Sequence, residues 1–275
     1  MKESFVRNYY VNVSETATYD VGITYFSDTD TTLELYKGGK LLGNITLPAT
    51  NGENSSSVMR GIDIEKGFGI ISFKVVKGKA NILSYFFTVG TKITEQSFDL
   101  GAPSYIDGTW KTENGKLILD VNDNHDISHG KVFYGAETLG DYAVTADITF
   151  NGYNRNAGII VRGTNPAIGG AGNDTMLGRY FFRGYYVAFE RNNGIVIYKM
   201  NYERSPIRAN FKMPLDKESY TIRIEVIGNN LKVYLDGAFL LEITDNDLPF
   251  FNGSVGFTGL NSVLTVDNLK IEPVV

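Results

Sequence analysis

With 275 residues, the chain is long enough for two β domains of ordinary size, each with its own core. Its 26 basic residues against 31 acidic ones give a net charge of -5, which disfavours nucleic acid and anionic membrane surfaces as partners. The absence of cysteine excludes disulfides, thiolate nucleophiles and cysteine-ligated zinc.

The first residues already alternate between apolar and polar side chains. Phe5-Val6-Arg7-Asn8-Tyr9-Tyr10-Val11 has the two-residue period of a β-strand, so the sequence begins close to or inside a first strand. The start lacks a basic segment followed by an apolar stretch, and no run is long enough to cross a bilayer. We therefore expect no export signal in this sequence and interpret it as a piece of a longer protein.

The first part of the chain contains further strand patterns separated by turn clusters. Glycines in Lys37-Gly38-Gly39-Lys40 predict a tight hairpin between two of these strands. Residues 88–96 are more polar, and a second set of strands opens with Phe98. This pattern predicts a domain over residues 1–90, a linker over 91–96 and a second domain over 97–275. The predicted strands of the first domain include residues 19–26, 32–36, 69–75 and 82–87.

The second part shows many short apolar-alternating segments at regular spacing, which is typical of a β-sandwich. Asp236-Gly237 marks a tight turn, so the segments around it predict a meander. Helix signals are almost absent. We predict an all-β chain of two jelly-roll sandwiches, the second of concanavalin or laminin-G type. The predicted strands of the second domain are 115–121, 142–148, 158–162, 185–189, 195–198, 220–226, 231–235, 253–257 and 264–271.

A set of short strings in the second part resembles one known family. In their order and spacing they are similar to the concanavalin-like carbohydrate-binding modules related to family 66, a group that includes levan-binding modules of glycosidases. The resemblance covers residues 97–275 and implies a sugar-binding sandwich. The strings are residues 108–117, 141–142, 157–162, 184–187, 233–237, 253–257 and 267–269.

The first part resembles the family 6 and family 35 type of carbohydrate-binding sandwich, through residues 19–25, 33–36, 47–52 and 62–67. The opening strands of that type, which often carry structural calcium, are not recognisable, so the domain is expected to be shortened. The resemblance places Asn81 where a ligand amide lies. Tandems of this kind resemble C-terminal parts of clostridial-type arabinan-, xylan- or galactan-active hydrolases.

The candidate sugar site of the second domain depends on strand alternation. In Gly158-Ile160-Arg162 and in Tyr186-Ala188-Glu190 every second side chain shares a face, and the resemblance puts both strands in one sheet. Arg162, Tyr186 and Glu190 would then converge as donor, stacking ring and acceptor for the hydroxyls of a terminal sugar. The alternative is that Arg162 and Glu190 only neutralise each other. Asn151 and Tyr153 are expected to close the site from its rim.

Trp110, the only tryptophan, is interpreted as packing at the edge of the core rather than as a sugar platform. A glycosidase of this fold would need two carboxylates on one strand face, and the nearest pair, Glu242 and Asp245, falls on opposite faces. His125 and His129 lie in a predicted loop without a third ligand, so a zinc site is not expected.

Metal binding has one candidate site. Asp99 and Asp267, near the two ends of the second domain, are the residues that could share a structural calcium ion. The alternative interpretation makes them ordinary turn and cap residues, and no other cofactor is expected.

These patterns predict a non-catalytic pair of carbohydrate-binding modules. They would target a parent secreted bacterial glycoside hydrolase, outside the cell or on its surface, to terminal sugars of arabinan, galactan, xylan or fructan. The expected partners are carbohydrate and the catalytic domain of the parent. Two alternatives stay open: sandwich domains that only buttress that catalytic domain, and, less favoured, a jelly-roll hydrolase or lyase.

Overall fold

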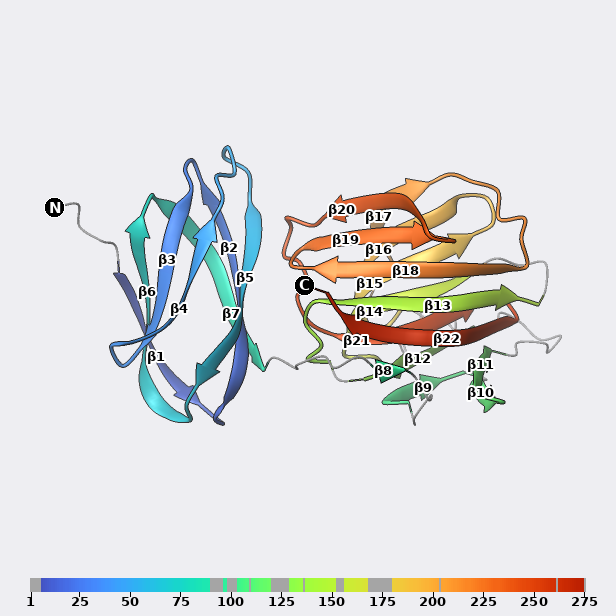
Figure 1. The fold of residues 1–275 in the computed structure, drawn as a ribbon, viewed down its shortest axis with the longest axis horizontal. Coiled ribbons are helices and arrows are strands. Elements are labelled where there is room, and N and C mark those ends of the chain that lie inside the picture. The colour runs from blue at the N-terminus through green and yellow to red at the C-terminus, as the bar shows by residue number, and fades with distance from the viewer. Residues whose placement is uncertain are drawn as a thin grey trace. The chain divides into compact units, whose positions relative to one another are not determined.

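The structure is a computed structural model, in which every regular element of the described residues is a β-strand (Figure 1). The all-β sandwich expected from the sequence is therefore confirmed. The chain divides into two compact units, Met1–Thr91 with Asp245–Phe251, and Lys92–Thr244 with Asn252–Val275. The prediction had assigned residues 245–251 to the second domain, whereas they cluster with the first unit. The structure describes residues 6–89, 96–97, 103–108, 110–119, 129–135, 137–151, 156–167, 180–202, 204–260 and 262–274.

The first unit is a sandwich of two antiparallel sheets, coloured blue to cyan in Figure 1. The four-stranded sheet has the order β1-β6-β3-β4, and the three-stranded sheet has the order β5-β2-β7. Its strands are β1 (Val6–Val13), β2 (Ala17–Ser27), β3 (Thr31–Lys37), β4 (Lys40–Leu47), β5 (Ser55–Ile64), β6 (Gly67–Lys77) and β7 (Ala80–Val89).

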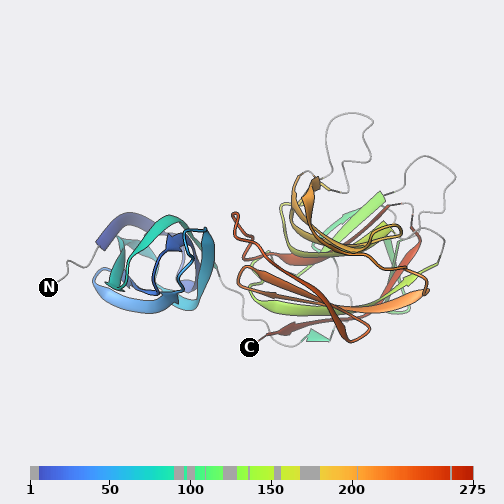
Figure 2. The ribbon, with the colours of Figure 1, turned by 90° about the horizontal axis from the view of Figure 1, so that it is seen from above.

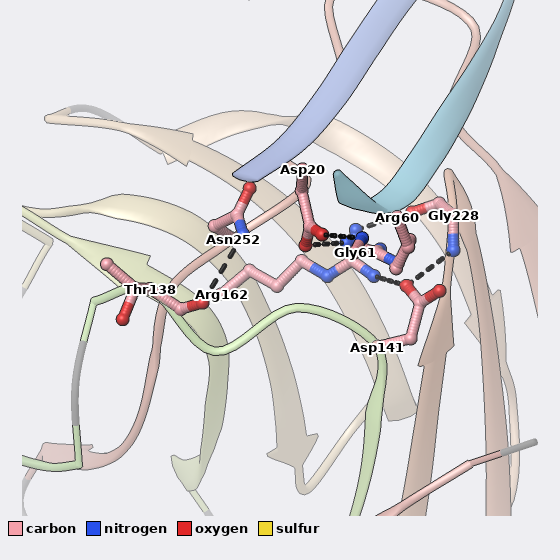
Figure 3. Close-up of polar contacts among 8 residues, drawn as sticks. All are labelled: Asp20, Arg60, Gly61, Thr138, Asp141, Arg162, Gly228 and Asn252. Carbon is pink, nitrogen blue, oxygen red and sulfur yellow. Dashed lines mark hydrogen bonds and ion pairs between the residues drawn. The ribbon is translucent and has the colours of Figure 1, made fainter. Parts of the chain in front are cut away.

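The predicted hairpin at Lys37-Gly38-Gly39-Lys40 is confirmed. β3 pairs with β4, and the two glycines have φ of 56° and 83°, a region in which a Cβ atom is unfavourable. A bulge interrupts the β2–β5 pairing, where Asp20 accepts hydrogen bonds from the Arg60 guanidinium and, at 3.2 Å, from the Gly61 N–H (Figure 3). Because Asp20 is buried, these bonds are needed to offset its desolvation.

The second unit is a larger sandwich whose two sheets form stacked layers in Figure 2. The eight-stranded sheet contains β10 (Trp110–Glu113), β11 (Lys116–Leu119), β22 (Leu264–Pro273), β13 (Tyr142–Phe150), β18 (Ser219–Ile227), β19 (Asn230–Leu235) and β20 (Ala238–Thr244) in that order, with β8 (Gln96–Ser97) pairing β22. The seven-stranded sheet contains, in order, β17 (Arg204–Phe211), β16 (Gly194–Asn201), β15 (Arg183–Glu190), β14 (Asn156–Thr164), β21 (Ser254–Leu260), β12 (His129–Tyr134) and β9 (Tyr105–Asp107).

The core of the second unit lies between these sheets, and strand alternation decides which residues fill it. In β18 the buried residues are every second one, Tyr220, Ile222, Ile224 and Val226. Full burial of such a side chain contributes roughly 1.5–3 kcal/mol. β18, β19 and β20 pair in succession, and Asp236 and Gly237 both have positive φ, so the predicted meander is confirmed.

Trp110 is 8% exposed, and β10 brings it opposite Leu119 of the core. Its indole lies where a side chain at Gly130 would have to be. This packing agrees with the interpretation of Trp110 as a residue of the core edge.

Candidate functional site

The seven-stranded sheet has an inner face, turned to the core, and an outer face. Phe189 of β15 contacts Phe150 and Tyr220 of the other sheet at ring distances of 5.4 and 5.6 Å, so it marks the inner face. Tyr186, Ala188 and Glu190 alternate with Phe189 and therefore lie on the outer face. Of the predicted site residues, Tyr186 and Glu190 do share this face.

Aromatic side chains form the floor of the outer face. Tyr186 and Tyr198 occupy paired positions of β15 and β16, and their rings stack with centroids 6.1 Å apart. Both are 1% exposed, and they belong to an aromatic and aliphatic cluster with Phe133, Ile160 and Phe182. Tyr186 is thus part of a packed floor, where its ring would support a ligand from below instead of stacking on it in the open.

Glu190 lies at the more accessible end of this floor. Its carboxylate accepts hydrogen bonds of 2.7 Å from the Tyr198 hydroxyl and from the Asn193 side-chain amide. Asn156 of β14 pairs directly with Glu190, and both are half-buried. An acceptor beside an amide, over aromatic rings, is an arrangement suited to sugar hydroxyls.

A buried lysine that was not predicted as a site residue lies on the same face. Lys131 of β12 forms an ion pair of 2.8 Å with Asp107 of β9, with side-chain exposures of 0% and 20%. Burial lowers the pKa of Lys131, and Asp107 opposes this shift. The ammonium also lies 5.5 Å from the centre of the Tyr105 ring. The signal in the sequence was a lysine placed among the apolar residues of a single strand.

Two hydroxyl groups flank Lys131. Thr258 of β21 pairs with Lys131, and Tyr105 pairs with Phe133 of the floor, so both point to the outer face. The Thr258 Oγ1 and Tyr105 Oη atoms are buried and make no hydrogen bond within the described part of the chain. Buried hydroxyls normally have a partner, so these two suit a water molecule or a polar ligand.

Arg162, predicted to converge with Tyr186 and Glu190, does not do so. The pairing of β14 with β15 shifts between Val161 and Thr164, and Arg162 has a φ of 53°, so strand alternation is broken at this residue. Its side chain is fully buried and reaches Asp141 at 2.8 Å and the Gly228 carbonyl (Figure 3). The prediction was wrong because it extended a period of two through a bulge.

The contacts of Arg162 are structural. Asp141 also accepts a 2.8 Å hydrogen bond from the Gly228 N–H, so three residues form a closed set that joins β14 to the β18–β19 turn. The Arg162 N–H donates to the Tyr142 hydroxyl at 2.7 Å. Burial raises the pKa of Tyr142, which keeps this phenol protonated. The open alternative, an Arg162–Glu190 pair, is also wrong, since Arg162 pairs with Asp141.

Of the two predicted rim residues, Asn151 alone lies in the described structure. The Asn151 amide donates to Thr265 of β22 at 2.9 Å, which holds it to the eight-stranded sheet. Tyr153 lies outside the described residues.

Asn81 of the first unit is exposed on β7, next to Ala80 and Ile82, which pack on the core. It lines a cavity of about 1000 Å³ that belongs wholly to the first unit. Its role as a ligand amide stays a prediction.

Of the two metal candidates, Asp267 alone lies in the described structure. Asp267 binds the Lys116 ammonium at 2.8 Å, and this bond, with the Asn268 N–H, lowers the pKa of the Asp267 carboxyl. Asp99 and His125 lie outside the described residues. Among the described residues no group of three or more histidine, aspartate or glutamate side chains could hold a metal ion. In the same part of the chain no helix is long and apolar enough to span a membrane.

Comparison with known proteins assigns the second unit to a family. Residues 96–272 match the 3-keto-alpha-glucoside-1,2-lyase-like domain, and the chain belongs to this family. This family differs from the one that the sequence strings resemble. A search among curated proteins found no match.

Several solved structures are similar in fold. The carbohydrate-binding module CBM66 from Bacillus subtilis is 18% identical, with a TM-score of 0.45, over 60% of this chain and 92% of that one. The VIP36 exoplasmic/lumenal domain in metal-free form is 11% identical, with a TM-score of 0.48, over 62% of this chain and 84% of that one. A Bacillus subtilis protein of unknown function with a galectin-like fold is 12% identical, with a TM-score of 0.47, over 65% and 98%. The family 6 and family 35 resemblance of the first unit stays a prediction.

Proposed function

We propose that the second unit binds a glycan on the outer face of its seven-stranded sheet. The observation that carries the proposal is the pair of buried hydroxyls, Tyr105 Oη and Thr258 Oγ1, which make no hydrogen bond to the described residues and flank Lys131. Glu190 and Asn156 supply acceptor and amide groups on the same face. Sugar hydroxyls both donate and accept, so they fit such a mixed set.

The ligand that we propose is a terminal sugar of an arabinan, galactan, xylan or fructan type of polysaccharide. Aromatic rings under a limited set of polar groups suit one or two sugar rings better than a long flat chain. Arg162 has no part in the site. Tyr186 supports the floor, and Tyr153 stays a proposed rim residue.

Calorimetry of the purified chain with levan, arabinan, xylan and galactan tests the proposal. We expect binding to at least one polymer, weakened about 2- to 12-fold by Tyr105→Phe and by Thr258→Val, the equivalent of one hydrogen bond. Because neither hydroxyl has a partner among the described residues, both variants should keep or slightly raise the free energy of unfolding.

The matched control is Glu218→Gln, an exposed residue before β18, which should bind as the wild type does, whereas Glu190→Gln should bind more weakly. Failure to bind any of the polymers contradicts the proposal. Wild-type affinity in both hydroxyl variants contradicts the assignment of the site.

A second candidate is catalysis on the same face, and Lys131 favours it. A lysine whose pKa is lowered by burial holds a larger neutral fraction and can take a proton from carbon beside a carbonyl group. The family is described as 3-keto-alpha-glucoside-1,2-lyase-like, and a 3-keto sugar has such a carbon. Turnover of a 3-keto-glucoside by the chain, lost in Lys131→Met, would establish catalysis. Binding without turnover would leave the binding role.

We also propose that the chain serves a secreted glycoside hydrolase as an accessory part. The support is the resemblance of its sequence to tandem modules, and the test is the natural gene, which should encode a catalytic domain in the same protein. The buttressing alternative predicts that the isolated chain binds no glycan, so strong binding would refute it.

A further inference from the structure

The first unit contains a cavity that the proposed glycan site does not use. It measures about 1000 Å³, within the size range of pockets that bind small molecules. It is lined by the edge strands β1 and β7, by β6, and by the segments around Thr29 and Gly78. All the lining residues belong to the first unit.

The floor of this cavity is apolar and reaches the core. Leu33 and Phe73 are 1% and 5% exposed, so the cavity descends to side chains of the central cluster. Val75 and Ile82 pack on the same cluster from β6 and β7, and Tyr9 contacts Phe73 from β1 with ring centroids 6.2 Å apart. Such walls offer few groups for sugar hydroxyls and suit a hydrocarbon body.

The rim of the cavity is cationic. Arg7, Lys77 and Lys79 line it, and no aspartate or glutamate is among its described lining residues. Lys77 and Lys79 are exposed and form no ion pair with the described residues. The nearby Asp30 carboxylate accepts a hydrogen bond of 3.0 Å from the Ala49 N–H. A cationic rim on a chain of net charge -5 favours an anionic head group.

The positions of the two lysines are fixed by the turn between β6 and β7. Gly78 has a φ of 77°, and a Cβ atom there would clash with the Asp30 carbonyl and with Thr31. The Ser27 hydroxyl, itself buried, donates to the Lys79 carbonyl at 2.6 Å. The rim is therefore held by the fold and does not depend on the lysine side chains themselves.

From this combination we propose that the first unit binds an amphipathic carboxylate, of the fatty-acid class, in this cavity. The hydrocarbon chain lies on the apolar floor, and the carboxylate lies at the rim beside Lys77, Lys79 and Arg7. The inference is independent of the glycan site of the second unit, because no residue is shared.

Calorimetry with octanoate, decanoate and dodecanoate below their micelle concentrations tests the proposal on the whole chain. Affinity should rise about fourfold for each buried methylene, as expected for transfer of CH₂ from water, and should level off when the cavity is full. Acetate should not bind. Dodecanol, with the chain but without the charge, should bind more weakly than dodecanoate.

Variants then locate the ligand. Lys77→Gln with Lys79→Gln should weaken dodecanoate about tenfold and leave dodecanol unchanged, because the substitutions remove charge alone. Lys40→Gln, an exposed lysine of the same unit outside the cavity, is the matched control and should change neither affinity. Val75→Phe, which narrows the cavity, should abolish binding of both, with an unchanged melting temperature as the check on folding.

The proposal is overturned if no member of the series binds, if affinity is independent of chain length, or if Lys40→Gln weakens binding as much as the rim substitutions do. Competition by a charged oligosaccharide such as oligogalacturonate, at affinity above that of dodecanoate, also overturns it, since the cavity would then be a sugar site.

Discussion

Removal of the Arg162 side chain should destabilise the second unit without affecting ligand binding. In Arg162→Met the Asp141 carboxylate loses its 2.8 Å ion pair, and the Gly228 carbonyl loses its donor. The Arg162 side chain is 0% exposed and that of Asp141 is 19% exposed. Breaking a buried pair by removing one partner costs about 3–5 kcal/mol, and the lower end applies here because Asp141 keeps the Gly228 N–H and some solvent.

The assay is urea unfolding followed by tryptophan fluorescence. Trp110 is the only tryptophan of the chain and lies in the second unit, so its signal reports that unit alone. With a slope of about 2 kcal/mol per molar urea, a loss of about 3 kcal/mol moves the midpoint down by about 1.5 M. Lys212→Met, at an exposed lysine, is the control and should stay within about 0.5 kcal/mol of the wild type.

Adding Asp141→Asn to Arg162→Met should cost less than the sum of the two single changes, because the second removes a carboxylate that the first has stranded. A wild-type midpoint for Arg162→Met would refute the reasoning. So would a selective loss of glycan binding with unchanged stability, which would return Arg162 to the site.

Two further predictions concern the second unit. Hydrogen bonds from Lys270 and Arg223 lower the pKa of Glu272. The stabilisation that they provide is therefore present above the ordinary carboxyl pKa and is lost as the pH falls through the lowered one, so Glu272→Gln should flatten the acid side of a stability-against-pH curve. Gly253→Ala should cost clearly more than Gly237→Ala in urea unfolding: both glycines have positive φ, worth about 1 kcal/mol of strain, but only at Gly253 would a Cβ atom strike a neighbour, the Arg162 backbone. An equal loss of unfolding free energy in the two variants would show that the backbone around Arg162 can shift to accommodate the Cβ atom.

The sequence predicted the parts of the fold that follow from local rules. Alternation located strands such as β18, and the Gly38-Gly39 and Asp236-Gly237 pairs located two turns, because both signals act within a few residues. The order of the strands in the sheets was not predictable in this way. It depends on pairings such as β13 with β22, which join residues more than a hundred positions apart.

The candidate site was predicted in part for the same reason. Tyr186 and Glu190 fall on one face because β15 is a regular strand. The prediction for Arg162 failed because the strand bulges after Val161 and Arg162 has a positive φ. The residue at this position is neither glycine nor proline, so the sequence carries no local signal of the irregularity there. Lys131 was missed because its burial is decided by Asp107 and Thr258 on neighbouring strands, which the sequence separates from it.

Among the described residues of the second unit, Arg162 and Lys131 are cations with fully buried side chains, and comparison of the two separates structure from function. Arg162 pairs with Asp141 and Lys131 pairs with Asp107, each at 2.8 Å and each with a fully buried cation. The two differ in chemistry, since an arginine stays charged whereas burial lowers the pKa of Lys131. Functional sites typically contain a group that can change its charge. Here that group is Lys131, which lies beside hydroxyls without a partner in the described structure.

Paired substitutions test this contrast. Lys131→Met with Asp107→Asn removes both charges and should recover most of the stability that Lys131→Met alone loses, because no unpaired carboxylate remains. Arg162→Met with Asp141→Asn should behave in the same way in urea unfolding. Ligand assays should distinguish the two double variants. Glycan binding or turnover is expected to disappear in the Lys131 pair and to persist in the Arg162 pair. If both pairs keep the wild-type affinity, Lys131 is a second structural cation and the outer face loses its strongest claim to function.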